Sequence, residues 1–123
     1  MIKDTVIYQF KSDPKRNIRI SKEYADKASK LINIVLESKT KNEFSNKVMQ
    51  DDSLKGIYVS PKAAANLFFT EPGTPQYLKA QDTLYFATCL HMFHDGIITQ
   101  DGLDKYNTIR EAENIKRVLD SLA

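Results

Sequence analysis

Alternating apolar and polar residues at the start of the chain predict a β-hairpin. The runs Thr5–Phe10 and Asn17–Ile20 both alternate in this way. Because successive side chains in a strand point to opposite faces, each run has one apolar face that can be buried. Asp13 and Pro14 supply turn chemistry within the connection Lys11–Arg16. The pattern therefore predicts two paired strands.

Helical spacing of apolar residues follows the hairpin. A first amphipathic helix is predicted from the N-cap Ser21 to about Leu36, and a second, shorter one over residues 41–49. Thr40 and Glu43 form a capping box, in which the threonine hydroxyl accepts from the Glu43 amide and the glutamate side chain reaches back. The two helices resemble a helix-turn-helix unit.

A cap followed by proline occurs twice and predicts the next two helices. Ser60–Pro61 begins a helix that ends near Phe69, and Thr74–Pro75 begins a long helix that ends near His94. Apolar residues surround the second half of the long helix, which predicts the central, most buried element. The run Lys55–Val59 predicts a short third strand beside the hairpin.

The last part of the chain predicts a second helix-turn-helix unit. Asp95–Gly96 ends the long helix, Thr99 caps a short one, and Thr108–Glu111 is another capping box. A shift of 59 positions aligns this unit with the first, through either duplication or chance. The identical pairs are Ala28 and Ala87, Leu31 and Leu90, and Thr40 and Thr99.

These elements predict one domain over residues 1–123, with pseudo-repeat halves 1–62 and 63–123. The fold class is α+β and mostly helical: an N-terminal hairpin, a short third strand and two helix-turn-helix units in a winged-helix-like arrangement. A chain of 123 residues is long enough for a hydrophobic core. A single cysteine excludes an internal disulfide framework. We expect a cytoplasmic protein, since neither a signal peptide nor a membrane-spanning run is visible.

The sequence carries no catalytic signature, and we expect a non-enzyme without a cofactor. The metal-like cluster Cys89, His91, His94 and Asp95 shares one helix. That helix is apolar all round, so buried core positions explain these residues better than metal ligation does. The same cysteine and histidines are poorly placed for a nucleophile–base pair, and no oxyanion-hole loop accompanies them.

Positive charge is concentrated in the first half of the chain. The net charge is only +2, but residues 1–62 hold 13 Lys and Arg against 8 Asp and Glu. This asymmetry is typical of a polyanion-binding half or of a solvated lysine-rich surface. Four cations cluster around the hairpin, and the polar residues of the 41–49 helix suit phosphates and base edges. The candidate DNA-binding residues are Lys11, Lys15, Arg16, Arg19, Lys39, Lys41, Asn42, Asn46 and Lys47.

Two resemblances point to DNA. The segment Tyr58–Leu67 resembles the opening helix of excisionase-like winged helix-turn-helix proteins, although a capped core helix explains it equally well. The hairpin and the Thr40 and Thr99 units together resemble the small double-stranded-DNA-binding transfer proteins of Gram-positive conjugative plasmids, the TraN type. That resemblance implies a non-enzymatic accessory role in DNA transfer for a mobile element. The partly acidic Thr99 unit departs from the expected DNA-contacting pattern.

The alternative is a protein-binding module, either a component of a transfer apparatus or a phage or plasmid inhibitor of a host factor. The segment Asp95–Tyr106 resembles short helical hairpins of small Gram-positive proteins that take part in partner contacts. Exposed Ile97, Ile98 or Tyr106 would favour this alternative, because clustered apolar surface marks contact sites. The DNA hypothesis instead requires Arg16 and Lys41 to lie on one common surface. The oligomeric state is left open.

Overall fold

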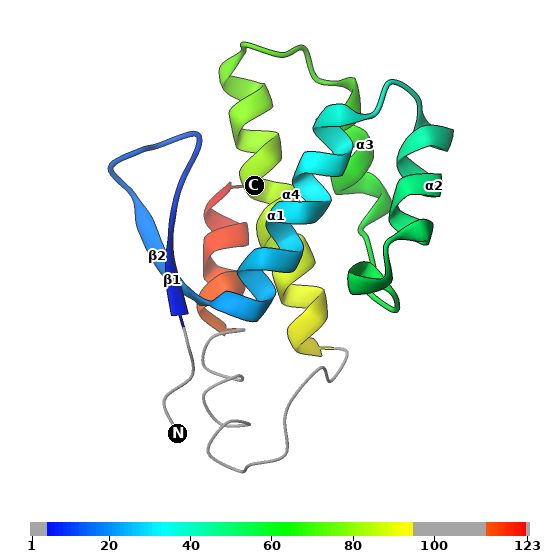
Figure 1. The fold of residues 1–123 in the computed structure, drawn as a ribbon. Helices are drawn as coiled ribbons and strands as arrows, with labels where there is room; N and C mark the ends of the chain where they lie inside the picture. Colours follow the sequence, from blue (N-terminus) through cyan, green and yellow to red (C-terminus); the bar gives the residue numbers. More distant parts are fainter. Residues whose placement is uncertain (1–4, 95–112, 123) are drawn as a thin grey trace, which may run out of the picture.

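The computed structural model describes residues 5–94 and 113–122, and within them the protein is a mostly helical α+β fold with an N-terminal hairpin (Figure 1). This confirms the predicted fold class. The elements are β1 (Thr5–Gln9), β2 (Asn17–Ser21), α1 (Lys22–Glu37), α2 (Lys41–Gln50), the 3-10 turn η1 (Asp52–Leu54), α3 (Pro61–Phe69), α4 (Pro75–His94) and a helical segment over residues 113–122.

The hairpin is antiparallel, and its inner face packs on α4. Tyr8 lies opposite Ile18 in the register, and its ring stacks on Tyr85 with the centroids 4.0 Å apart. Phe10 is 2% exposed, and its ring centroid lies 5.2 Å from that of Phe86. The predicted alternation is therefore confirmed, and it places the apolar face of the hairpin in the core.

The predicted third strand is wrong. The structure describes all of Lys55–Val59, and that segment contains no strand; the sheet among the described residues has two strands. Gly56 has a φ of +82° in the turn after η1, and this left-handed conformation bends the backbone out of an extended path. Ile57 and Val59 instead pack against the core from a loop.

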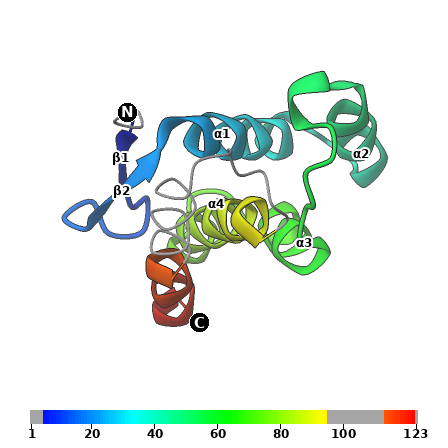
Figure 2. The same cartoon turned by 90° about the horizontal axis from the view of Figure 1, so that it is seen from below.

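Helix α4 is the central element, as predicted from its apolar circumference. Leu84, Phe86 and Cys89 are each 0% exposed. Helices α1 and α3 and the 113–122 segment surround it (Figure 2). From residues 113–122, Ile115, Val118 and Leu122 are buried in the same core.

Local capping signals located the helix starts correctly. The Thr40 hydroxyl accepts from the Glu43 amide at 3.1 Å, and the Ser60 hydroxyl accepts from the Ala63 amide at 3.3 Å. The second hydrogen bond of the capping box differs from the expected one. The Glu43 side chain accepts from the Lys39 amide at 3.0 Å and not from the Thr40 amide. Ser21 precedes α1 as predicted, but its side chain makes no capping hydrogen bond.

Several predictions lie outside the described residues. These are the helix end at Asp95–Gly96, the Thr99 unit, the Thr108–Glu111 capping box and the Asp95–Tyr106 segment. The proposed duplication depends on them and stays a prediction. Among the helices that the structure does describe, none combines the length and apolar content needed to cross a bilayer.

Candidate functional site

The four hairpin cations are exposed, but two of them are held by contacts within the protein. Lys11 and Lys15 extend from the connection. The Arg16 guanidinium lies 4.6 Å from the centroid of the Phe10 ring, and its Nη2 donates to Ser121 Oγ at 2.8 Å. Arg19 Nη1 donates to Thr5 Oγ1 at 3.0 Å. The hairpin tip is therefore joined to the 113–122 segment through Arg16.

The polar residues predicted for DNA contact on α2 do not form one free face. Lys39, Asn42 and Asn46 are exposed. Lys47 Nζ pairs with Glu43 Oε1 at 3.2 Å, which offsets its charge. Lys41 turns toward α3 instead, where its Nζ lies 4.9 Å from the centroid of the Phe69 ring.

The two basic groups lie at opposite ends of the molecule. In both views the hairpin projects from one side and α2 lies on the other, with α1 between them (Figures 1 and 2). Helix α1 has 16 residues, and at 1.5 Å per residue it is about 24 Å long. The expected common surface joining Arg16 and Lys41 is therefore wrong, although DNA binding by either group alone stays a prediction.

The end of the molecule at α2 and α3 carries an apolar groove of about 400 Å³. Phe44 and Val48 form one wall from α2, and Ala64 and Phe68 form the other from α3. These pairs are four residues apart, so each helix presents a row of apolar side chains to the groove. Met49 lines the rim with 82% of its side chain exposed.

Helix α2 sits on the molecule without a buried anchor. None of its residues is buried, and its contact with the core passes through the half-buried Phe44 and Val48. Phe69, at 68% exposure, lies beside the groove residue Lys41, and Tyr58, at 49%, directly precedes the groove residue Val59. Large apolar side chains that stay exposed beside a groove mark a contact surface.

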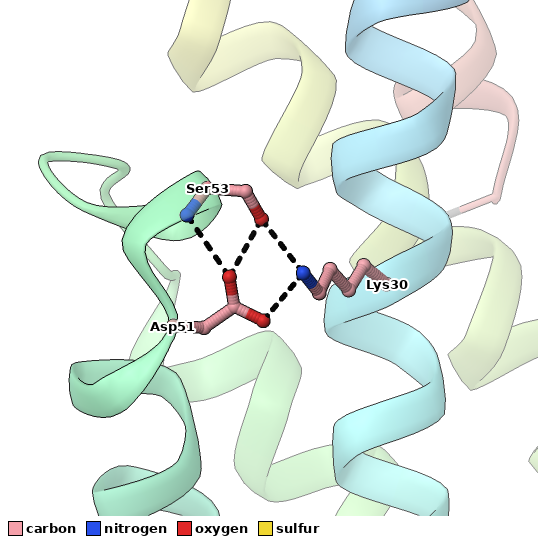
Figure 3. Close-up of polar contacts among 3 residues, drawn as sticks. All are labelled: Lys30, Asp51 and Ser53. Carbon is pink, nitrogen blue, oxygen red and sulfur yellow. Dashed lines mark hydrogen bonds and ion pairs between the residues drawn. The ribbon is translucent and has the colours of Figure 1, made fainter.

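The end of α2 is fixed by a polar cluster that connects it to α1 (Figure 3). Lys30 Nζ lies 2.7 Å from Asp51 Oδ2 and donates to Ser53 Oγ at 2.9 Å. Asp51 Oδ1 accepts from the Ser53 amide at 2.9 Å and from its hydroxyl at 2.6 Å. The hydrogen bond from Lys30, followed by those from Ser53, lowers the pKa of Asp51. The Asp-x-Ser spacing of residues 51–53 is typical of a side-chain turn and was the signal in the sequence.

The charge lining the groove is positive. Lys41 is the one charged residue among the groove-lining residues in the part of the chain described. The nearby Glu43 is engaged by the Lys39 amide and by Lys47, and these bonds lower its pKa, the backbone bond most strongly. The groove therefore combines apolar walls with one cation, Lys41, which lies over the Phe69 ring and has no acidic partner among the groove-lining residues described.

The buried carboxylate of Asp82 was missed in the sequence. It is 0% exposed and accepts from the Tyr8 hydroxyl at 2.5 Å, the Lys11 amide at 2.9 Å, the Ser12 amide at 3.0 Å and the Ser12 hydroxyl at 2.6 Å. Burial, and then the bond to Asp82, raises the pKa of Tyr8. This cluster fixes the hairpin on α4. Asp82 lies four residues from both Leu78 and Phe86 along the helix, and this acid in line with apolar residues was the signal that could have revealed it.

The comparisons with known proteins do not indicate a function, so the function is proposed from the geometry of the structure. No protein-family model matches the chain, and neither a curated protein sequence nor a solved structure matches it.

Proposed function

We propose that the protein is a protein-binding module whose groove between α2 and α3 takes an amphipathic helix of a partner. The observation that supports this most directly is the groove itself, an apolar opening of about 400 Å³ flanked by a helix with no buried residue. Helix-in-groove recognition uses such a surface, with the apolar face of the bound helix providing anchors at i, i+3 or i+4, and i+7.

The shape of the groove favours a helix over an extended peptide. Two helices form its walls, and both present side chains in rows four residues apart. Ala64 and Ala65 keep the α3 wall low, which lets another helix approach closely. Neither wall offers a strand edge to which an extended backbone could add.

The charge of the groove indicates an acidic residue on the partner helix. Lys41 is positioned at the α2 end of the groove, and Glu43 is already occupied by Lys39 and Lys47. An opposite charge on the partner beside Lys41 would fix the orientation of the bound helix and raise its association rate. We therefore expect a partner helix with leucine-type anchors and a flanking Glu or Asp.

Fluorescence anisotropy with a designed peptide tests the proposal. The probe is a labelled 20-residue amphipathic helix with leucines at i, i+3, i+4 and i+7 and glutamates on its flank. We expect Met49→Lys and Ala65→Trp to weaken its binding by about tenfold or more, because they charge or fill the groove. Leu78→Lys is the matched control, an exposed apolar residue on α4 that does not line the groove.

The outcome is decided by which variants weaken binding. Loss of affinity with Met49→Lys but not with Leu78→Lys supports the groove as the docking surface. Equal affinity of all three variants, or dimers that disappear in the Met49→Lys variant, would contradict the proposal. The second result would assign the groove to another copy of this chain.

Duplex DNA binding at the hairpin end is the second candidate. Its supporting observation is that Lys11, Lys15, Arg16 and Arg19 are all exposed around one hairpin, with only Asp13 as an exposed acid there. A duplex titration at two salt concentrations tests it, and we expect the double variant Lys15→Ala/Arg16→Ala to lower affinity equally for unrelated sequences. Wild-type affinity in that variant contradicts DNA contact by the hairpin.

A further inference from the structure

A second opening lies at the hairpin end, between β1, α1 and α4. It has a volume of about 500 Å³, within the range of ligand-binding clefts. Its walls mix apolar and polar side chains, unlike the groove between α2 and α3. The lining residues that matter here are Ile7 and Lys11 from the hairpin, Asn33 and Leu36 from α1, and Gln81 from α4.

The strand that borders this cleft has an unpaired edge. Phe10 N donates to Arg16 O at 3.0 Å, which makes Phe10 and Arg16 a hydrogen-bonded pair of the hairpin. In an antiparallel ladder such pairs alternate with pairs whose backbone groups point outward. The register pairs Ile7 with Arg19, so the N–H and C=O of Ile7 point away from β2. Within the described residues no hydrogen bond reaches them.

Gln81 is a polar residue in the wall of the cleft. The residue as a whole is 8% exposed. Among the described residues no buried side-chain polar atom lacks a partner, so the amide atoms of Gln81 reach the solvent in the cleft. A side-chain amide has two donor hydrogens and an acceptor oxygen, so a ligand in the cleft can hydrogen-bond to it.

Charge selects between possible ligands. Lys11 is the one charged side chain among the described lining residues, and the adjacent carboxylate of Asp82 is fully occupied by Tyr8, Lys11 and Ser12. Lys15 is a second exposed cation in the connection, in which Asp13 is the one exposed acid. The cleft therefore complements an acidic ligand.

We infer that this cleft binds an acidic, extended peptide of a partner protein, which adds a strand to the free edge of β1. The backbone of the peptide pairs with the outward N–H and C=O of Ile7. A polar side chain of the peptide bonds to Gln81, and its carboxylates face Lys11. The site is separate from the groove between α2 and α3, so the two openings together make the protein an adaptor for two segments.

Selection from a phage-displayed library of random 12-residue peptides on the full chain tests the inference. We expect the selected peptides to be rich in Asp and Glu. Synthetic versions, measured by fluorescence anisotropy, should lose about tenfold or more in affinity when alternate backbone nitrogens are methylated, since that removes the strand-pairing donors. This measurement needs no protein variant.

Two protein variants locate the site. Ile7→Pro removes the outward N–H without touching a β1–β2 hydrogen bond, and Arg19→Pro makes the same change on the opposite edge as its matched control. We expect only the first to abolish binding. Gln81→Met keeps the volume, removes the amide and should weaken binding about threefold to tenfold. Circular dichroism of each variant checks that the fold is retained.

Several results would overturn the inference. These are a selection that enriches no peptide, enriched peptides that tolerate N-methylation, and binding that survives both Ile7→Pro and Gln81→Met. Sedimentation showing a dimer that Ile7→Pro dissociates would assign the edge to a second copy of the chain. A DNA duplex that shifts the NMR signals of the Gln81 amide would assign the cleft to nucleic acid.

Discussion

The hairpin end and the α2–α3 end are joined to the same core in opposite ways. At the hairpin end, the polar contact is buried: Asp82 is 0% exposed and accepts four hydrogen bonds. At the other end, the polar contacts of Asp51 and Glu43 lie at the surface, while apolar side chains such as Met49 stay exposed. The polar contacts are therefore buried at the hairpin end, whereas the α2–α3 end exposes an apolar surface.

The largest effect should come from Asp82→Ala. The change leaves the Tyr8 hydroxyl, two backbone amides and the Ser12 hydroxyl without their acceptor. Partial access of water limits the cost, and we expect the free energy of unfolding to fall by about 2–4 kcal/mol in urea denaturation. Asp52→Ala, at an exposed carboxylate, should stay within about 0.5 kcal/mol. A loss below about 1 kcal/mol for Asp82→Ala would show that the hairpin is held mainly by its aromatic contacts.

Tyr8→Phe should give the next effect. It removes one hydrogen bond to a carboxylate and keeps the ring on Tyr85, so we expect a loss of about 1.5–2 kcal/mol by the same measurement. Tyr58→Phe is the matched control, because the Tyr58 ring is 49% exposed at the other end of the molecule. Equal losses of unfolding free energy in Tyr8→Phe and Tyr58→Phe would show that the tyrosine hydroxyls at the two ends stabilise the fold equally.

Alkaline pH should weaken the hairpin end selectively. Burial and the bond to Asp82 raise the pKa of Tyr8 above its ordinary value near 10. A group whose pKa is higher in the folded protein contributes stability that is present below the unfolded pKa and is lost as pH rises beyond it. The free energy of unfolding should therefore fall above pH of about 10, and less steeply in Tyr8→Phe. Identical pH dependence in both proteins would exclude Tyr8 as the cause.

The smallest effect should come from Asp51→Asn. The pair with Lys30 lies at the surface and contributes little to global stability, but it fixes the end of α2. We expect faster hydrogen exchange at the α2 amides with unchanged exchange in α4. Asp13→Asn in the hairpin connection is the control. If exchange in α2 does not change, the groove wall is held by Phe44 and Val48 alone.

Local signals in the sequence located most of the fold. The starts of α2 and α3 depend on Thr40 and Ser60, whose hydroxyls bond to amides three residues ahead, so a short stretch of chain contains all the information. The prediction of a third strand over Lys55–Val59 relied on residue types alone. A strand also needs a neighbouring edge and an extended backbone, and the turn at Gly56 provides neither.

The sites depended on packing that no local pattern contains. Asp82 meets Ser12 across 70 residues of sequence, so only the folded chain brings them together. The groove also depends on packing. Phe44 and Val48 give α2 an apolar face in the sequence, but the sequence does not show whether α3 covers that face. The separation of Arg16 from Lys41 follows from the placement of α1 between them, a rigid spacer that the predicted DNA surface did not take into account.

The 70-residue separation between Ser12 and Asp82 has a consequence for biosynthesis. Ribosomes add roughly 5–20 residues per second, so the anchoring carboxylate is made about 4–14 s after the hairpin connection. During that interval the nascent strands lack α4, and the side chains of Tyr8 and Phe10 lack the rings of Tyr85 and Phe86 on which they pack. We expect chaperones that act on emerging chains to bind this segment first and to release it once α4 has been made.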